Sequence, residues 1–267
     1  MSMVASLAGS KMKKVGIYLT CQGFLVKKAI ELAYPDYQIV IAENWRQISN
    51  NEPLSKDFDD VDVFIYQPLI GDFAEFLMPE HIIAHRLRSD VQLVTVPYIA
   101  WTGLFPWAVN GEVLQPAKSA YCNTWLDKYS KATANIASVW DDESEEAIAE
   151  NAEKSLNILE SKEETSDIKG IAEYIRNHYK QHPLFYTVNH PRGHLALFFV
   201  NQIFKCLGWR ELPNEMYKEL DRVLDIEKLP LSSRVSSALG LNYVDRVCYY
   251  IDKKPRTIAN YLNNYFN

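Results

Sequence analysis

The chain has 267 residues, of which 48% are hydrophobic and 23% are charged, and its formal net charge is -6. These values are typical of a soluble globular protein and exclude a disordered or fibrous chain. The acidic balance argues against a general nucleic-acid binder, and a chain of this length can bury a sizeable core.

The counts of glycine and cysteine restrict further the classes of protein to which the chain can belong. Only 10 glycines are present, roughly half of the usual share of about 7%. Neither G-x-G-x-x-G nor G-x-x-x-x-G-K-[ST] occurs, so a glycine-rich nucleotide-binding loop is not expected. Four widely spaced cysteines without a C-x-x-C pair indicate a reducing compartment. No apolar run is long enough for a membrane span, and the positive charges near the N-terminus follow the apolar stretch instead of preceding it as in a secretory signal. We therefore expect a cytoplasmic protein.

The first part of the chain alternates between short apolar runs and segments with helical spacing. Strands are predicted at residues 14–20, 37–42, 61–67 and 91–96, and helices at 23–33 and 73–87. Such alternation is typical of βαβ units, and near-continuous apolar strands suit a sheet that is covered on both faces. We therefore expect an α/β fold of three layers with a mostly parallel sheet.

The second half is predicted to be largely helical. Helices are expected at residues 119–129, 141–167, 168–182, 191–207 and 256–265, with one short strand at 184–188. We expect a flexible N-terminus over residues 1–12 and a single α/β domain over 13–267. Helical additions to that domain are expected at roughly 118–182 and 210–267.

Cys21 follows the first predicted strand and precedes the first predicted helix. Ligands of open parallel sheets bind beyond the carboxyl ends of the strands, and a helix N-terminus stabilises a thiolate. Cys21 is therefore a candidate for a reactive or ligand-facing thiol. The alternative is a buried structural cysteine, which is also the expectation for Cys122, Cys206 and Cys248.

Polar residues crowd between two apolar segments at Thr187–His194. Pro191 suits the first turn of a helix, which would put Asn189 and His190 at the helix mouth. There the dipole would keep His190 neutral and available as a base. A polar capping loop without chemistry is the alternative.

Two further segments lie at the carboxyl ends of predicted strands, at the same edge of the sheet as Cys21. Tyr66 and Gln67 close the third strand, and an aromatic loop with Trp101 follows the fourth. Gln67 is a candidate donor to an oxyanion or a sugar hydroxyl. The aromatic side chains suit stacking on a sugar or a base, although core or lid packing is the more ordinary expectation for them. Arg86, Arg88 and Arg192 are candidate phosphate contacts.

All six histidines fall in pairs spaced by four residues, which places two rings on one helical face. The pairs are His81/His85, His178/His182 and His190/His194. No H-E-x-x-H motif and no third ligand accompanies them, so no metal site is expected.

The order of these motifs resembles that of a known family. A strand leading into Cys21-Gln22, then Tyr66-Gln67-Pro68, then an aromatic Gly-x-x-Pro loop, then Asn189-His190-Pro191 is similar to the WcbI family of bacterial polysaccharide biosynthesis proteins. The family pattern Gly-Asn-Cys-Gln is replaced here by Leu-Thr-Cys-Gln. The layout also resembles SGNH-type esterases in outline, with Cys21 at the place of the nucleophile and His190 at that of the base.

The resemblance implies a capsule-assembly acetyltransferase that uses acetyl-CoA and a sugar or polysaccharide acceptor. Cys21 and His190 are its expected catalytic residues, either as an acyl carrier with its base or as a thiol-lining residue and a base. The expected oxyanion or substrate contacts are Gln22, Gln67, Asn189, Tyr66 and Trp101. The expected coenzyme A contacts are Cys21, Gly23, Arg192, His194 and Arg86. The alternatives are a carbohydrate O-acetyl esterase with the same Cys21/His190 pair and a non-catalytic coenzyme A- or sugar-binding module.

The negative charge is concentrated in one segment. Residues 141–167 contain 11 Asp or Glu and two Lys, and the rest of the chain contains 26 basic and 23 acidic residues. The acidic segment is expected to form a solvated helix face. Because the remainder is slightly basic, the phosphates of coenzyme A are compatible with it.

Overall fold

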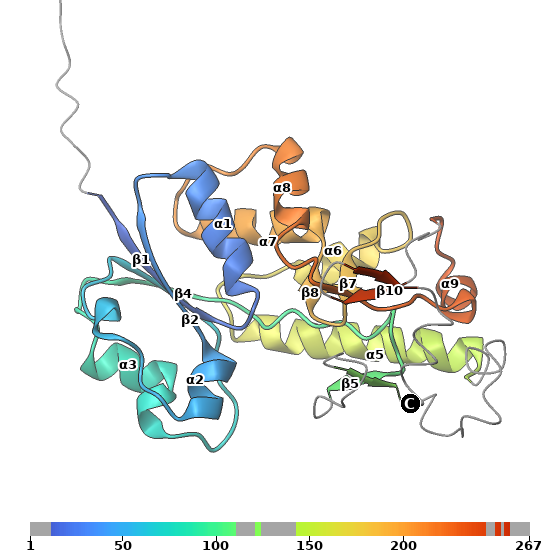
Figure 1. Ribbon diagram of the computed structural model, residues 1–267, viewed down its shortest axis with the longest axis horizontal. Helices are drawn as coiled ribbons and strands as arrows, with labels where there is room; N and C mark the ends of the chain where they lie inside the picture. The colour runs from blue at the N-terminus through green and yellow to red at the C-terminus, as the bar shows by residue number, and fades with distance from the viewer. Residues whose placement is uncertain (1–11, 111–120, 124–142, 244–248, 252–253, 257–267) are drawn as a thin grey trace, which may run out of the picture. The chain divides into compact units, whose positions relative to one another are not determined.

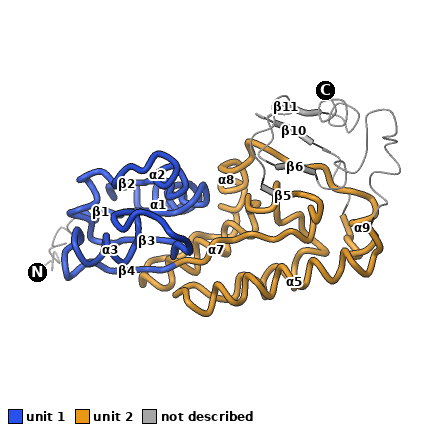
Figure 2. Tube along the Cα trace, turned by 90° about the horizontal axis from the view of Figure 1, so that it is seen from below, with its two compact units in different colours: residues 1–95 blue, residues 96–267 orange. Residues whose placement is uncertain are grey.

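The computed structural model describes residues 12–110, 121–123, 143–243, 249–251 and 254–256. By its internal contacts the chain divides into two compact units, residues 1–95 and residues 96–267 (Figure 2). Each unit is described below by itself. The expectation of a single domain over residues 13–267 stays a prediction.

The first unit is built around a parallel sheet of four strands. The strands are β1 (Lys14–Leu19), β2 (Gln38–Glu43), β3 (Val63–Tyr66) and β4 (Gln92–Thr95). They lie in the order β2-β1-β3-β4, and Ile17 of β1 is in register with Ile41 of β2 and Ile65 of β3. The predicted α/β class and parallel sheet are confirmed. All four carboxyl ends meet at one edge, where Cys21 follows β1.

Helices cover both faces of this sheet (Figure 1). The helix α1 (Gly23–Ala33) buries Leu25, Val26, Ala29 and Ile30 on one side. On the other side, Tyr18 and Phe64 pack with Phe58 and Ile82 in a buried cluster. Alternate side chains of one strand therefore enter opposite cores, as the two-residue period of a strand requires. The other helices of this unit are α2 (Asn44–Asn50), α3 (Pro79–His85) and the 3₁₀ turns Lys56–Phe58 and Glu75–Leu77.

The second unit is mainly helical with small antiparallel ribbons. Its helices are α5 (Glu145–Glu164), α6 (Ile171–His178), α7 (Gly193–Cys206), α8 (Tyr217–Asp221), α9 (Ser233–Leu239) and the 3₁₀ turn Asn214–Met216. Its ribbons are β5 (Ala108–Asn110) with β6 (Tyr121–Asn123), β7 (Phe185–Thr187) with β8 (His190–Pro191), and β9 (Glu227–Lys228) with β10 (Tyr249–Ile251) and β11 (Lys254–Arg256). Among the described residues no helix is long and apolar enough to cross a membrane.

The bounds of two predicted helices differ from those in the structure, in both cases next to a proline. The helix expected at 73–87 is divided into a 3₁₀ turn and α3, because Met78 takes an extended conformation before Pro79. The helix expected from Pro191 begins only at Gly193, because Pro191 pairs with Phe185 in the β7–β8 ribbon. His190 therefore lies in a short strand rather than at the mouth of a helix.

Other expectations for the second half fail or lie outside the described residues. The helix expected at 119–129 is wrong at residues 121–123, which form β6 in a pair with β5, and residues 124–129 lie outside the described ranges. Arg256 likewise belongs to β11 rather than to a helix, and residues 257–265 lie outside. Most of the flexible N-terminus expected at 1–12 also lies outside. The additions expected to be helical contain strands as well as helices.

Candidate functional site

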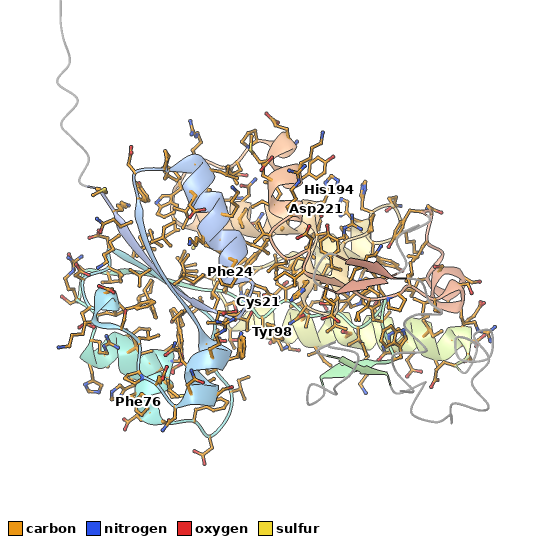
Figure 3. All side chains as sticks on the ribbon, in the orientation of Figure 1. Cys21, Phe24, Phe76, Tyr98, His194 and Asp221 are labelled. Atoms are coloured by element: carbon orange, nitrogen blue, oxygen red, sulfur yellow. The ribbon has the colours of Figure 1, made fainter. Side chains whose placement is uncertain are left out.

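Cys21 lies in a tight turn between β1 and α1. The N–H of Gly23 donates to the Thr20 carbonyl (2.9 Å), and the N–H of Phe24 donates to the Cys21 carbonyl (3.1 Å). A Cβ at Gly23 would lie 3.1 Å from Ile17 and 3.3 Å from Ile41, so glycine lets α1 start close to the sheet. Cys21 and Phe24 are labelled in Figure 3 at the start of α1. The chain thus presents this thiol at the carboxyl edge, as predicted.

Buried carboxamides hold the turn that carries Cys21. Gln67 Oε1 accepts the backbone N–H of Thr20 (2.8 Å) and a longer hydrogen bond from Asn44 Nδ2 (3.5 Å), and Gln67 Nε2 donates to Gln22 Oε1 (3.3 Å). Gln22 and Gln67 are 0% and 2% exposed. The structure therefore brings Cys21, Gln22 and Gln67 together, and the two glutamines with Asn44 connect the carboxyl ends of β1, β2 and β3.

The electrostatics at Cys21 differ from the expectation of a stabilised thiolate. Burial and then the negative charge of Glu43 raise the pKa of the Cys21 thiol to about 11, against the smaller lowering effects of Thr20 and of the backbone N–H groups of Gln22 and Cys21. Glu43 is held in place by Trp45 Nε1 (3.2 Å) and Arg46 Nε (2.6 Å). The thiol is therefore neutral at pH 7.

Apolar side chains stand at the same edge of the first unit. Phe24 follows β1, Trp45 follows β2 and Ile70 follows β3, and they are 37%, 47% and 90% exposed. Tyr66 is half-buried at the end of β3, where its ring stacks on Phe64 with centroids 5.3 Å apart. A sheet edge that carries a neutral thiol and exposed apolar groups is suited to an uncharged ligand chain.

The second unit contains a polar chain around Asn189. Thr187 Oγ1 donates to Asn189 Oδ1 (3.1 Å), and Asn189 Nδ2 donates to the Tyr98 hydroxyl (2.7 Å). The Lys162 ammonium lies 5.3 Å from the centroid of the Tyr98 ring, and burial lowers the pKa of Lys162. Asn189 is thus oriented by neighbours rather than by a helix N-terminus.

His190 is neutral at pH 7, although for a different reason from the predicted one. Burial lowers its pKa to about 4, against an opposing hydrogen bond with the Leu224 backbone, and Nδ1 is buried with no hydrogen-bonding partner among the described residues. A ring with so low a pKa is available as a proton acceptor but is a weak base.

The candidate phosphate contacts are engaged inside their own units. The Arg86 guanidinium binds Asp59 and the carbonyls of Leu54 (2.9 Å) and Ser55 (2.8 Å), which makes it a structural clamp of the first unit. Arg192 lies over the Tyr186 ring (4.6 Å), and its Nε is 3.5 Å from Asp221. The Arg88 side chain pairs with Asp62 and Asp90.

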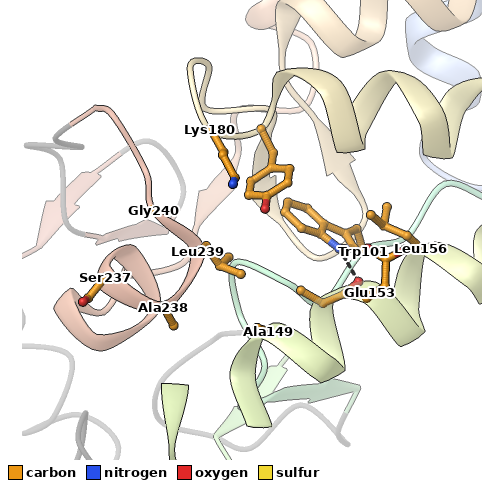
Figure 4. A pocket seen from close by; sticks show the side chains of 11 residues that line it. Trp101, Ala149, Glu153, Leu156, Lys180, Ser237, Ala238, Leu239 and Gly240 are labelled. Carbon is orange, nitrogen blue, oxygen red and sulfur yellow. Dashed lines mark hydrogen bonds between the residues drawn. The ribbon is translucent and has the colours of Figure 1, made fainter. Parts of the chain in front are cut away.

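Trp101 borders a pocket of about 410 Å³ in the second unit (Figure 4). Its indole N–H donates to the Ala152 carbonyl (3.0 Å), and its ring lies against Tyr179 with centroids 5.1 Å apart. Since Trp101 is fully buried, it packs in the core of its unit. Core packing, the ordinary expectation for the aromatic loop, describes this residue.

The predicted site residues thus fall in two groups. The first unit holds Cys21, Gln22, Gly23, Tyr66, Gln67 and Arg86, and the second holds Trp101, Asn189, His190, Arg192 and His194. Pairing of Cys21 with His190 stays a prediction. Within the described ranges no three His, Cys, Asp or Glu side chains are arranged to hold a metal ion. Cys206, expected to be buried, is exposed on α7.

Sequence reasoning missed Glu43 and Asn44, which complete the surroundings of Cys21. Both directly follow the second predicted strand. Ligands of open parallel sheets bind beyond the carboxyl ends of the strands, so the polar residues after the second strand are the sequence signal that points to them.

Comparisons with known proteins identify the family of the chain and a similar fold. The family model described as polysaccharide biosynthesis enzyme WcbI matches residues 14–212. A solved structure of WcbI, described as a native protein without a disulfide bond between coenzyme A and a cysteine, matches with a TM-score of 0.71 and 19% identity, covering 96% of this chain and 89% of that one. No curated protein matches the chain. The family resemblance is confirmed, and the likeness to SGNH-type esterases stays a prediction.

Proposed function

Because the chain belongs to the WcbI family of polysaccharide biosynthesis enzymes, we propose that it transfers an acyl group from acyl-coenzyme A to a sugar hydroxyl of a capsular or surface polysaccharide. In keeping with the family resemblance, the acyl group that we propose is acetyl. The observation that carries the proposal is the position of Cys21. It lies at the carboxyl edge of a parallel sheet, where such folds bind ligands. The description of the similar solved structure names coenzyme A together with a cysteine.

The residues around Cys21 suit the thiol end of coenzyme A. The neutral Cys21 thiol does not repel a thioester, and the exposed side chains of Phe24 and Trp45 offer apolar contacts to the pantetheine arm. The backbone N–H groups of Cys21 and Gln22 interact with Cys21 Sγ. They are our candidates for donors to the thioester oxygen. Arg86 does not suit a phosphate, since Asp59 and two carbonyls occupy its guanidinium.

The chemistry that we propose is direct transfer. The acceptor hydroxyl oxygen attacks the thioester carbonyl carbon, the carbon–sulfur bond breaks, and coenzyme A leaves as a thiolate that takes up a proton. The hydroxyl proton passes to a general base, for which His190 stays our candidate. With a pKa of about 11, only roughly one Cys21 thiol in ten thousand is ionised at pH 7, which favours a lining role over a covalent acyl carrier.

Thiol–disulfide exchange tests the position of coenzyme A. We expect coenzyme A disulfide to modify Cys21, with release of one coenzyme A thiol, at least about tenfold faster than glutathione disulfide, because binding raises the local concentration of the reagent. Intact mass and peptide mapping give the rate at each site. The exposed Cys206 is the internal control, since it should not distinguish the two disulfides.

Equal rates at Cys21 for both disulfides would overturn the proposal. Incubation with acetyl-coenzyme A alone then separates the routes, because a covalent carrier would gain an acetyl group on Cys21 and direct transfer would not. A protein that binds no coenzyme A by calorimetry but releases acetate from an acetylated sugar would be the alternative esterase.

A further inference from the structure

The second unit contains a pocket of about 620 Å³ that the proposed function does not use. It lies against α6, α7 and the segment from Glu211 to Tyr217. Its volume falls within the range of about 300–1,000 Å³ that is typical of small-molecule sites.

Aromatic rings that stack on one another are part of the lining of this pocket. Tyr174 stacks on His178 (centroids 4.1 Å apart) and on Phe198 (4.2 Å), and His194 stacks on Tyr217 (4.1 Å). The interplanar angles are 20°, 18° and 14°. Because each ring is held by a neighbour, the wall loses little side-chain entropy when a ligand binds.

The lining of the pocket also has a polar part. Glu211, Asn214 and Glu215 line it and are exposed, and Asn201 fixes the start of their segment by exchanging two hydrogen bonds with the Leu212 backbone (2.9 and 3.0 Å). Carboxylates and carboxamides are the groups that bind a ligand rich in hydroxyls.

The charged side chains of the lining favour a neutral ligand over an anion. Two glutamates line the pocket, and no lysine or arginine is among its lining residues within the described part of the chain. Burial and then the neighbouring His182 lower the pKa of His194, so this ring adds no positive charge at pH 7. The described residues of the lining therefore offer no lysine or arginine to a phosphate-bearing ligand such as coenzyme A or a sugar nucleotide.

We propose that this pocket is a saccharide subsite that takes a neutral pyranose ring, with its C–H face against an aromatic ring of the lining, Tyr217 or Phe198, and its hydroxyls bound by Glu215 and Asn214. The inference rests on the proposed function in expecting a saccharide ligand. It deepens that function by specifying the acceptor as a neutral sugar that is bound without a phosphate group.

Saturation-transfer NMR on the full chain tests this subsite. The probes are methyl α-glucopyranoside, methyl α-mannopyranoside and methyl α-galactopyranoside, each with and without coenzyme A. We expect at least one to receive saturation on its ring C–H protons. Tyr217→Ala should weaken its binding by roughly threefold to tenfold, while Tyr217→Phe, which keeps the ring, should bind like the unmodified protein.

A second pair of variants keeps the test valid if Tyr217→Ala does not fold. Glu215→Ala, at an exposed position on the rim, should weaken the binding, and Glu219→Ala, at an exposed position of α8 outside the lining, should not. Absence of saturation transfer for all three sugars, or equal binding in all variants, would overturn the inference. So would tighter binding of methyl glucuronide, an anionic sugar. Sugar binding and coenzyme A binding are measured separately, so either can fail alone.

Discussion

At the residue scale, the buried imidazole of His190 makes the free energy of unfolding depend on pH. The ring has a pKa of about 4 in the folded chain, against 6.5 for an unperturbed histidine. Between these values the unfolded chain binds a proton that the folded chain does not. The free energy of unfolding therefore falls as the pH drops from 6.5 towards 4, and it is unaffected by this group above 6.5.

We expect this effect to amount to about 3 kcal/mol between pH 7 and pH 4. Urea unfolding of the unmodified protein and of His190→Gln at both values measures it, since the variant lacks the titrating ring while the carboxylates contribute equally to both proteins. Similar losses of stability in the two proteins would contradict the burial of an uncharged ring at this position. An NMR titration of the ring protons gives the pKa directly.

Cys21 shows how far reasoning from the sequence reaches at this scale. The change from an apolar run to helical spacing located the thiol correctly at the end of β1. The sign of its pKa shift was not accessible, because burial and the charge of Glu43 outweigh the backbone N–H groups. Glu43 is 22 positions away along the chain and comes close only through the register that pairs it with Leu19.

At the scale of elements, a buried carboxylate joins two helices of the second unit. Glu163, in the last turn of α5, is 6% exposed and accepts the backbone N–H groups of Gly170 (2.9 Å) and Ala172 (2.8 Å). Gly170 is the N-cap of α6 and has φ +81°. The side chain of one helix thus satisfies free N–H groups at the start of the next, where the dipole also favours a negative charge.

Glu163→Gln should destabilise the protein by about 1.5–3 kcal/mol, because it loses a charge-assisted acceptor and brings a buried amide donor to face backbone N–H groups. Glu164→Gln is the matched control, since Glu164 is the exposed neighbour on the same helix, and we expect a change within about 0.5 kcal/mol. Midpoints of urea denaturation measure both. Equal midpoints for the two variants would show that the contact contributes nothing.

Elements were predictable where local pattern and tertiary context agree. The helix α1 was predicted with the bounds that it has, because its apolar spacing and Gly23 fit the sheet beneath it. The ribbon β7–β8 was not, since Pro191 fits a helix start equally well. There the chain is held by a pair with Phe185, and Gly193 starts α7 where an added Cβ would lie 2.2 Å from the Tyr217 carbonyl oxygen of α8.

At the scale of the whole molecule, the acidity of the chain is not evenly spread. Residues 141–167 account for 11 of its 34 acidic residues. They are not only a solvated face, since Glu153 and Glu160 of α5 bind Arg176 of α6 (both 2.8 Å). The rest of the chain has 26 basic and 23 acidic residues. An anionic donor therefore meets no net repulsion from that part of the chain.

This balance predicts how salt affects the binding of coenzyme A. Thermal melting with coenzyme A and with pantetheine, which lacks the phosphates, should show stabilisation by both ligands, because both carry the thiol arm that we assign to the Cys21 turn. Raising the salt concentration from about 0.05 M to about 0.5 M screens charge. The extra stabilisation by coenzyme A should then fall towards that of pantetheine, and Cys21→Ala should weaken both shifts. Arg86→Lys should not reduce the shift caused by coenzyme A more than the shift caused by pantetheine, because Arg86 is bound to Asp59. Loss of the coenzyme A shift alone in that variant would show that Arg86 contacts the phosphates and would contradict this prediction.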